Sequence, residues 1–192
     1  TYSVLKASEV TVEMNPDSMD AESLTRLREA GFNRLSIGVQ SANNSILRFI
    51  GRRHSFEQAE DAFRLARKCG FDNVSADLIY GLPAQTREDW ADSLAAILAL
   101  EPAHISCYGL KLEPGTPLYA YKNAPLVPDD DTQADMYLYA VDTLKAYGYF
   151  QYEISNFALR DRESRHNLKY WRLEDYAGFG ASAASGLGDR RY

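Results

Sequence analysis

The sequence has few cysteines, no excess of positive charge and no long apolar run. Its two cysteines, Cys69 and Cys107, are far apart, and we interpret each as a small buried apolar residue. Scarce cysteine fits a reducing, cytoplasmic environment. The net charge of −6 predicts no nucleic-acid binding, and we expect membrane contact only through partner proteins. A membrane span needs about 18 apolar residues in a row, and no run approaches that length.

The chain also lacks an initiator methionine, and Thr1 stands almost directly before a strand pattern. Its 192 residues are fewer than the roughly 250 of a complete eight-stranded β/α barrel. We therefore expect a fragment of a longer protein. No signal-peptide pattern is visible, and a targeting segment upstream of Thr1 stays an open alternative.

Residues 1–148 alternate between strand-like and helix-like segments. Strands are expected near 8–13, 34–38, 74–79 and 104–110, and glycines stop three of the amphipathic helices that follow them, at Gly31, Gly70 and Gly148. This order predicts an α/β fold with a mostly parallel sheet. From Tyr149 the chain becomes aromatic and then charged, so we assign residues 149–192 to the start of a separate covering element.

Polar side chains stand where three of these strands are expected to end. They are Glu13, Gln40 and Asp77, and each follows an apolar or β-branched stretch. In a parallel β/α barrel the ligand sits at the C-terminal rim of the strands, so these side chains predict a binding face for a small molecule.

Several strings, taken in order, resemble the radical S-adenosylmethionine superfamily. More narrowly, they are similar to the group that contains oxygen-independent coproporphyrinogen III oxidase and the heme chaperone HemW. The resemblance covers nearly the whole chain and implies a partial, TIM-like (β/α)6 barrel, with about strands 3 to 6 present in residues 1–148. The strings are the Glu13 strand with Asn15-Pro16, Gly31–Ser41, Gly51–His54, Asp77–Pro83 with Gln85-Thr86, and His104–Tyr108.

The resemblance implies a binding site for S-adenosylmethionine. The residues matching Gln40 and Asp77 face the ribose and neighbouring parts of the cofactor, the arginine matching Arg52 holds the methionine carboxylate, and Glu13 contacts the same cofactor. The chemistry agrees, because ribose hydroxyls need acceptors and a carboxylate suits a guanidinium.

Each residue also has a plainer interpretation. Asp77 could cap a turn, Glu13 could pair with Arg34 across neighbouring strands, and Arg52 could be a solvated loop charge beside Arg53. Their joint position at matching strand ends favours the cofactor site.

The resemblance further implies a [4Fe–4S] cluster, held by a Cys-x3-Cys-x2-Cys loop early in the barrel. Cys69 and Cys107 lack that spacing, so we expect no metal ligand within the chain and place the cluster ligands upstream of residue 1. A Gly-Gly-rich segment of the family is absent as well. As it stands, the chain should not perform radical chemistry.

The C-terminal stretch separates the two relatives. The residues from His166 to Trp171 match a His-Asn-x-x-Tyr-Trp motif that resembles the heme-chaperone branch, in which the histidine is implicated in heme binding. Imidazole is a common axial ligand, and Tyr170 and Trp171 could stack on a macrocycle. The alternative is a surface histidine beside two core aromatics. We interpret His54 as a neighbour of the cofactor site and His104 as a hydrogen-bonded structural residue.

The leading hypothesis is a HemW-like protein that binds a [4Fe–4S] cluster, S-adenosylmethionine and heme, and passes heme to acceptor proteins. One alternative is an enzyme, oxygen-independent coproporphyrinogen III oxidase, which acts in porphyrin biosynthesis. Another is a barrel without a cluster that only binds small molecules. No residue is assigned a catalytic role.

Overall fold

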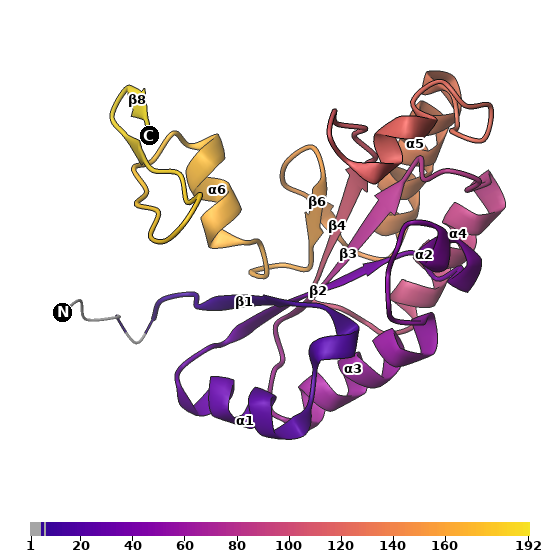
Figure 1. The fold of residues 1–192 in the computed structure, drawn as a ribbon. Helices are drawn as coiled ribbons and strands as arrows, with labels where there is room; N and C mark the ends of the chain where they lie inside the picture. Colours follow the sequence, from indigo (N-terminus) through magenta and orange to yellow (C-terminus); the bar gives the residue numbers. More distant parts are fainter. Residues whose placement is uncertain (1–4, 6) are drawn as a thin grey trace.

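The computed structural model describes residue 5 and residues 7–192, and its centre is a six-stranded sheet (Figure 1). Strands β1 to β4 are parallel neighbours in chain order, and β6 and β5 add an antiparallel edge beside β4. The sheet strands are β1 Thr11–Met14, β2 Arg34–Gln40, β3 Val74–Tyr80, β4 His104–Gly109, β5 Phe150–Gln151 and β6 Asn156–Ala158.

Helices follow the parallel strands and cover one side of the sheet, whereas α6 and a small hairpin, β7 Gly186–Leu187 with β8 Arg190–Arg191, lie on the other side (Figure 1). Within the described residues, no helix is long and apolar enough to cross a bilayer. The helices are α1 Ala21–Glu29, α2 Asn44–Phe49, α3 Phe56–Lys68, α4 Arg87–Leu98, α5 Asp130–Ala146 and α6 Arg165–Trp171, with 3₁₀ turns η1 Pro16–Ser18 and η2 Pro117–Tyr121.

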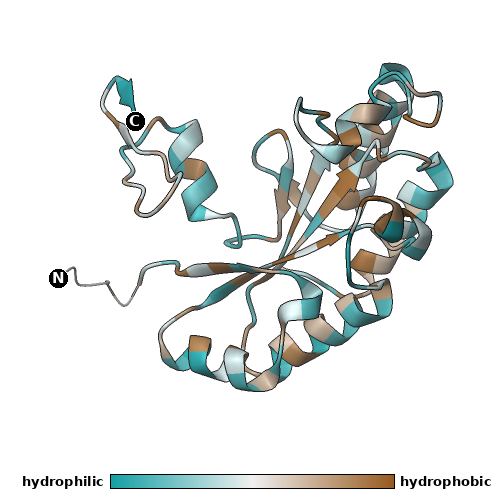
Figure 2. Ribbon diagram, in the orientation of Figure 1, coloured by the Kyte–Doolittle hydropathy of each residue, from teal (hydrophilic) through white to brown (hydrophobic). Residues whose placement is uncertain are grey.

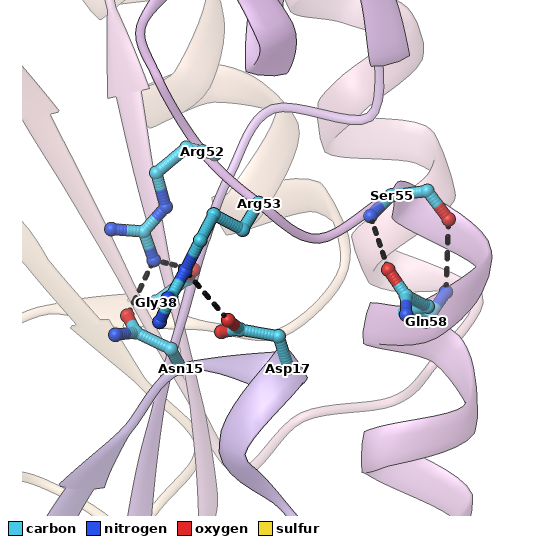
Figure 3. A network of polar contacts seen from close by, with 7 residues as sticks. All are labelled: Asn15, Asp17, Gly38, Arg52, Arg53, Ser55 and Gln58. Carbon is cyan, nitrogen blue, oxygen red and sulfur yellow. Dashed lines mark hydrogen bonds and ion pairs between the residues drawn. The ribbon is translucent and has the colours of Figure 1, made fainter.

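Local sequence signals explain where the helices start. Ser55 and Gln58 form a reciprocal capping box before α3 (Figure 3), and Thr86 and Asp89 form another before α4. Asp129 caps α5 through the backbone N–H of Thr132. The alternation of strands and helices predicted from the sequence is therefore confirmed.

The core lies between the sheet and the helices that cover it. Alternate residues of each strand point to opposite faces, and the helix-facing set of β2 is Leu35, Ile37 and Val39, all fully buried. Trp90 of α4 and Phe63 of α3 pack against this set, and Figure 2 shows hydrophobic residues along β3 and β4. Burying one such apolar side chain stabilises the folded state by about 1.5–3 kcal/mol relative to leaving it exposed to water. The opposite face of the sheet is left free for polar groups.

The predicted partial barrel is confirmed in its parallel part, and the sheet is open, not closed. The segment from Tyr149 to Phe157 forms two short strands joined by a turn, and both belong to the main sheet. Two short helices, α2 and α6, were not predicted. The division of the chain at residue 149 stays a prediction.

Candidate cofactor-binding site

Gly38 in β2 is the centre of a polar cluster near the C-terminal end of the strand. A guanidinium nitrogen of Arg52 donates to the Gly38 carbonyl at 2.7 Å and to the side-chain oxygen of Asn15 at 2.6 Å (Figure 3). A Cβ added to Gly38 would lie 2.9 Å from the side-chain amide nitrogen (Nε2) of Gln40 and 3.0 Å from the same guanidinium nitrogen of Arg52. Only glycine leaves room for both side chains here.

Arg52 and Arg53 point to different partners, although they are adjacent in the chain. Arg53 forms an ion pair with Asp17 at 3.2 Å, and its side chain is 82% exposed (Figure 3). Arg52 turns instead towards the sheet, where burial lowers the pKa of its guanidinium and the charge of Asp17 partly opposes that shift. Arg53 is thus the solvated arginine, and Arg52 is available to bind an anion.

Asp77 lies in the middle of β3, and our expectation that it ends the strand was wrong. It pairs with Gly38 on one side and Ser106 on the other. The Ser36 hydroxyl donates to its carboxylate, with oxygen atoms 2.9 Å apart. Burial raises the pKa of Asp77, whereas the hydrogen bonds from Ser106 and Ser36 oppose that rise. The result is a half-buried acceptor on the polar face of the sheet.

Glu13 shares this face, because it lies in register with Ser36 in the next strand. The alternative pairing with Arg34 is not seen: no ion pair joins these two side chains in the described part of the chain. Gln40 is the last residue of β2, where a bulge and a positive φ of 72° turn its side chain towards Gly38. The structure thus brings Gln40 and Arg52 together at the rim, and Glu13 and Asp77 together on the polar face.

His104 is fully buried at the start of β4, which agrees with the structural role expected for it. Its Nδ1 lies 2.7 Å from the Ser75 hydroxyl, and its Nε2 lies 2.8 Å from the Tyr152 hydroxyl. Tyr152 in turn accepts the backbone N–H of Ser164, the N-cap of α6, at 3.2 Å. Burial, aided by the charge of Arg34, lowers the pKa of His104 to about 3. A neutral imidazole therefore joins the sheet to α6.

The α6 helix carries His166 and faces the polar side of the sheet. The ring of Tyr170 packs edge-on against the ring of His166, with the ring centroids 4.9 Å apart, and against the ring of Tyr176, with the centroids 4.6 Å apart. Tyr170 and Trp171 are 44% and 54% exposed, so the alternative that places them in the core was wrong. Both aromatic side chains are accessible to a ligand.

A cavity of about 1070 Å³ lies between the polar face, residues 7–9 and α6. Its lining includes three of the predicted residues, Glu13, Asp77 and His166, and also Arg34, Ser36 and Tyr108, which we did not predict as site residues. Gln40 and Arg52 lie outside this lining, beside Gly38. Arg34 and Ser36 alternate with the apolar Leu35 and Ile37, which places both polar side chains on one face of β2, but this pattern does not show that Arg34 is buried.

The residues fit S-adenosylmethionine better than they fit a cluster. Carboxylates suit ribose hydroxyls, and the guanidinium of Arg52 suits a carboxylate. By contrast, Cys107 is buried on the helix-facing side, where burial raises the pKa of its thiol. Cys69, the C-cap of α3, is partly buried and packs against the same core. Within the described residues, no three ligands gather to hold a metal ion.

Comparison with known proteins agrees with this arrangement. A model of the radical SAM superfamily matches residues 4–97. The heme chaperone HemW of Bacillus subtilis is 44% identical over 186 residues, which cover 96% of this chain and 49% of that relative. HemW of Escherichia coli is 39% identical over 176 residues, covering 92% and 46%.

Among solved structures, coproporphyrinogen III oxidase (HemN) from Escherichia coli, a radical SAM enzyme, matches with a TM-score of 0.81 at 28% identity. The match covers 96% of this chain and 46% of that one. The chain thus spans about half the length of the curated relatives that it matches.

Proposed function

Since the chain belongs to the radical SAM superfamily and is HemW-like, we propose that it is the cofactor- and heme-binding part of a heme chaperone. The observation that carries this proposal is the position of His166, which lines the same cavity as Glu13 and Asp77. One cavity then offers an imidazole for heme iron beside acceptors for S-adenosylmethionine. Acceptor proteins would receive the heme.

In this proposal Arg52 binds the methionine carboxylate of S-adenosylmethionine, and Gln40, Glu13 and Asp77 accept hydrogen bonds from its ribose and neighbouring groups. A [4Fe–4S] cluster, when bound, would supply an iron that anchors the cofactor and the electron that cleaves it. Its thiolate ligands are expected in residues upstream of this chain. The residues described here bind and orient the cofactor.

A change at Arg52 tests the cofactor site in a protein extended to the length of the relatives. Arg52→Ala should weaken S-adenosylmethionine binding by about 1.5–3 kcal/mol, because a charge-assisted hydrogen bond is lost. Asp77→Ala should act in the same direction. Arg53→Ala is the matched control, since Arg53 pairs only with Asp17 in the described residues. Calorimetry that finds wild-type affinity in both test variants would remove these residues from the site.

A heme titration tests the role of His166. His166→Ala should shift or weaken the Soret band of the heme complex, because the axial ligand is removed. His54→Gln is the matched control, since His54 is buried and bonds to the Val39 carbonyl away from the cavity. His104→Ala is unsuitable as a control, because His104 holds the start of α6 through Tyr152. An unchanged Soret band in His166→Ala would refute the ligand assignment.

Coproporphyrinogen III oxidase activity is the second candidate, and the structural match to that enzyme favours it. Sequence identity favours the chaperone, at 44% against 28%. The extended protein should release no carbon dioxide from coproporphyrinogen III with S-adenosylmethionine under reducing, anaerobic conditions. Sustained decarboxylation, together with heme binding that is unchanged in His166→Ala, would favour the oxidase.

A further inference from the structure

Arg34, the first residue of β2, is a buried arginine that faces the cavity, and its side chain has no partner in the part of the chain that the structure describes. Its exposed fraction is 4%, and it belongs to the cavity lining. Its Nε is buried and makes no hydrogen bond. Among residue 5 and residues 7–192, no side chain forms an ion pair with its guanidinium.

A buried guanidinium without a charged partner is stabilised when an anion binds to it. Arginine stays protonated in proteins, and a buried charge is costly unless it is paired. Asp77, on the same face, accepts a hydrogen bond from Ser36, and no ion pair joins Asp77 or Glu13 to Arg34 in the described residues. Burial raises the pKa of Asp77, although the charge of Arg34 opposes that rise. Neither Asp77 nor Glu13 therefore satisfies Arg34.

The α6 helix brings two more cations to the same cavity. Arg165 and Lys169 are four residues apart, so they lie on one face of the helix, and both line the cavity with His166. Arg165 also donates to the Ala7 carbonyl at 2.8 Å, which fixes it beside the N-terminal segment. Lys169 makes no ion pair within the described residues. Positive groups thus stand on two sides of the cavity.

Charge balance indicates which anion fits. The cavity is also lined by the acids Glu9, Glu13, Asp77 and Asp175, so a dianionic phosphate would meet more repulsion than a carboxylate. The fork of an arginine also matches a carboxylate through two parallel hydrogen bonds. A volume of about 1070 Å³ accommodates a macrocycle as well as its side chains.

We propose that Arg34 binds a carboxylate of the cavity's ligand, and that in the heme complex this carboxylate is a propionate. The assignment rests on the proposed function, because it takes heme as the ligand. His166 would then bind the iron while Arg34, on the sheet, binds a propionate at the edge of the ring. Heme would be held at both points, and its orientation in the cavity would be set.

The test compares heme with heme dimethyl ester, whose propionates are neutral, in titrations of the full 192-residue chain. The wild type should bind heme about tenfold or more tightly than the ester. Arg34→Met should lose this preference by weakening heme binding about tenfold, with ester binding unchanged. Retained ester binding also shows that the variant folds. The matched control Arg26→Met, an exposed position on α1, should behave as the wild type.

Each outcome separates this inference from the proposed function. Heme binding with an intact preference in Arg34→Met would overturn the inference and leave the chaperone proposal standing. Failure of the wild type to bind either porphyrin would overturn both. If Arg34→Met instead weakens S-adenosylmethionine binding in the extended protein and keeps the preference for heme, the carboxylate belongs to that cofactor and the propionate assignment is wrong.

Discussion

His104 should make the folded protein less stable as the pH falls below neutral. Its imidazole is fully buried, and its pKa in the folded state is lowered from 6.5 to about 3, mainly by burial. In the unfolded chain the same group titrates near pH 6.5. Below that pH the unfolded state takes up a proton that the folded state does not bind, so protonation favours unfolding.

The size of the effect follows from these two pKa values. Lowering the pH from 7 to 5 should remove about 2 kcal/mol from the free energy of unfolding through His104 alone. Urea unfolding at both pH values measures the change. In His104→Gln the amide can still bond to Ser75 and Tyr152 but does not titrate. The wild type should therefore lose about 2 kcal/mol more than this variant between pH 7 and pH 5.

A matched control is His166→Gln, because His166 is exposed and outside the buried network. It should keep the pH dependence of the wild type. If His104→Gln shows the same loss between pH 7 and pH 5 as the wild type, the buried, neutral state of His104 is refuted.

Gly38→Ala should cost little stability but displace Arg52, because the new methyl would lie 3.0 Å from the end of that flexible side chain. S-adenosylmethionine binding by the extended protein should weaken about tenfold or more, and normal affinity in calorimetry would contradict this. Trp90→Phe should lower the free energy of unfolding by about 1–2 kcal/mol, since the buried indole N–H donates to the Met136 carbonyl at 2.8 Å. An unchanged urea midpoint would count against that bond. Reconstituted anaerobically with iron and sulfide, the 192-residue chain should hold no stoichiometric cluster, because Cys69 and Cys107 are its only thiols. Iron retained after desalting at the [4Fe–4S] ratio would disprove this.

Much of the parallel sheet and its helices could be predicted from the sequence, because the signals that specify them are local. The cap residues Ser55, Thr86 and Asp129 stand directly before their helices, and Gly70 and Gly148 follow the ends of two of them. Apolar residues also recur along one side of α4, where Trp90 and Leu94 are buried. Short elements such as α2 were missed, since so few residues carry little periodic signal.

The site residues were predicted less completely. The sequence indicated Glu13, Gln40, Arg52, Asp77 and His166 through strand position and family resemblance, and their roles stay predictions. It did not indicate Arg34. A charged residue at the start of a strand is usually exposed. Only the packed sheet shows that this one is buried and that its Nε has no hydrogen-bond partner among the described residues.

The sequence by itself determined the α/β order, the family and the types of side chain available for binding. The tertiary structure alone decided which of them meet. The backbone N–H of Arg165 in α6 donates to the carboxylate of Glu9, 156 residues earlier in the sequence. His104 in β4 is linked to the start of α6 through the hydroxyl of Tyr152. Local propensity carries no information about such distant contacts, because they depend on how the sheet, its polar face and α6 pack together. That packing is what gathers Arg34, Asp77 and His166 around one cavity.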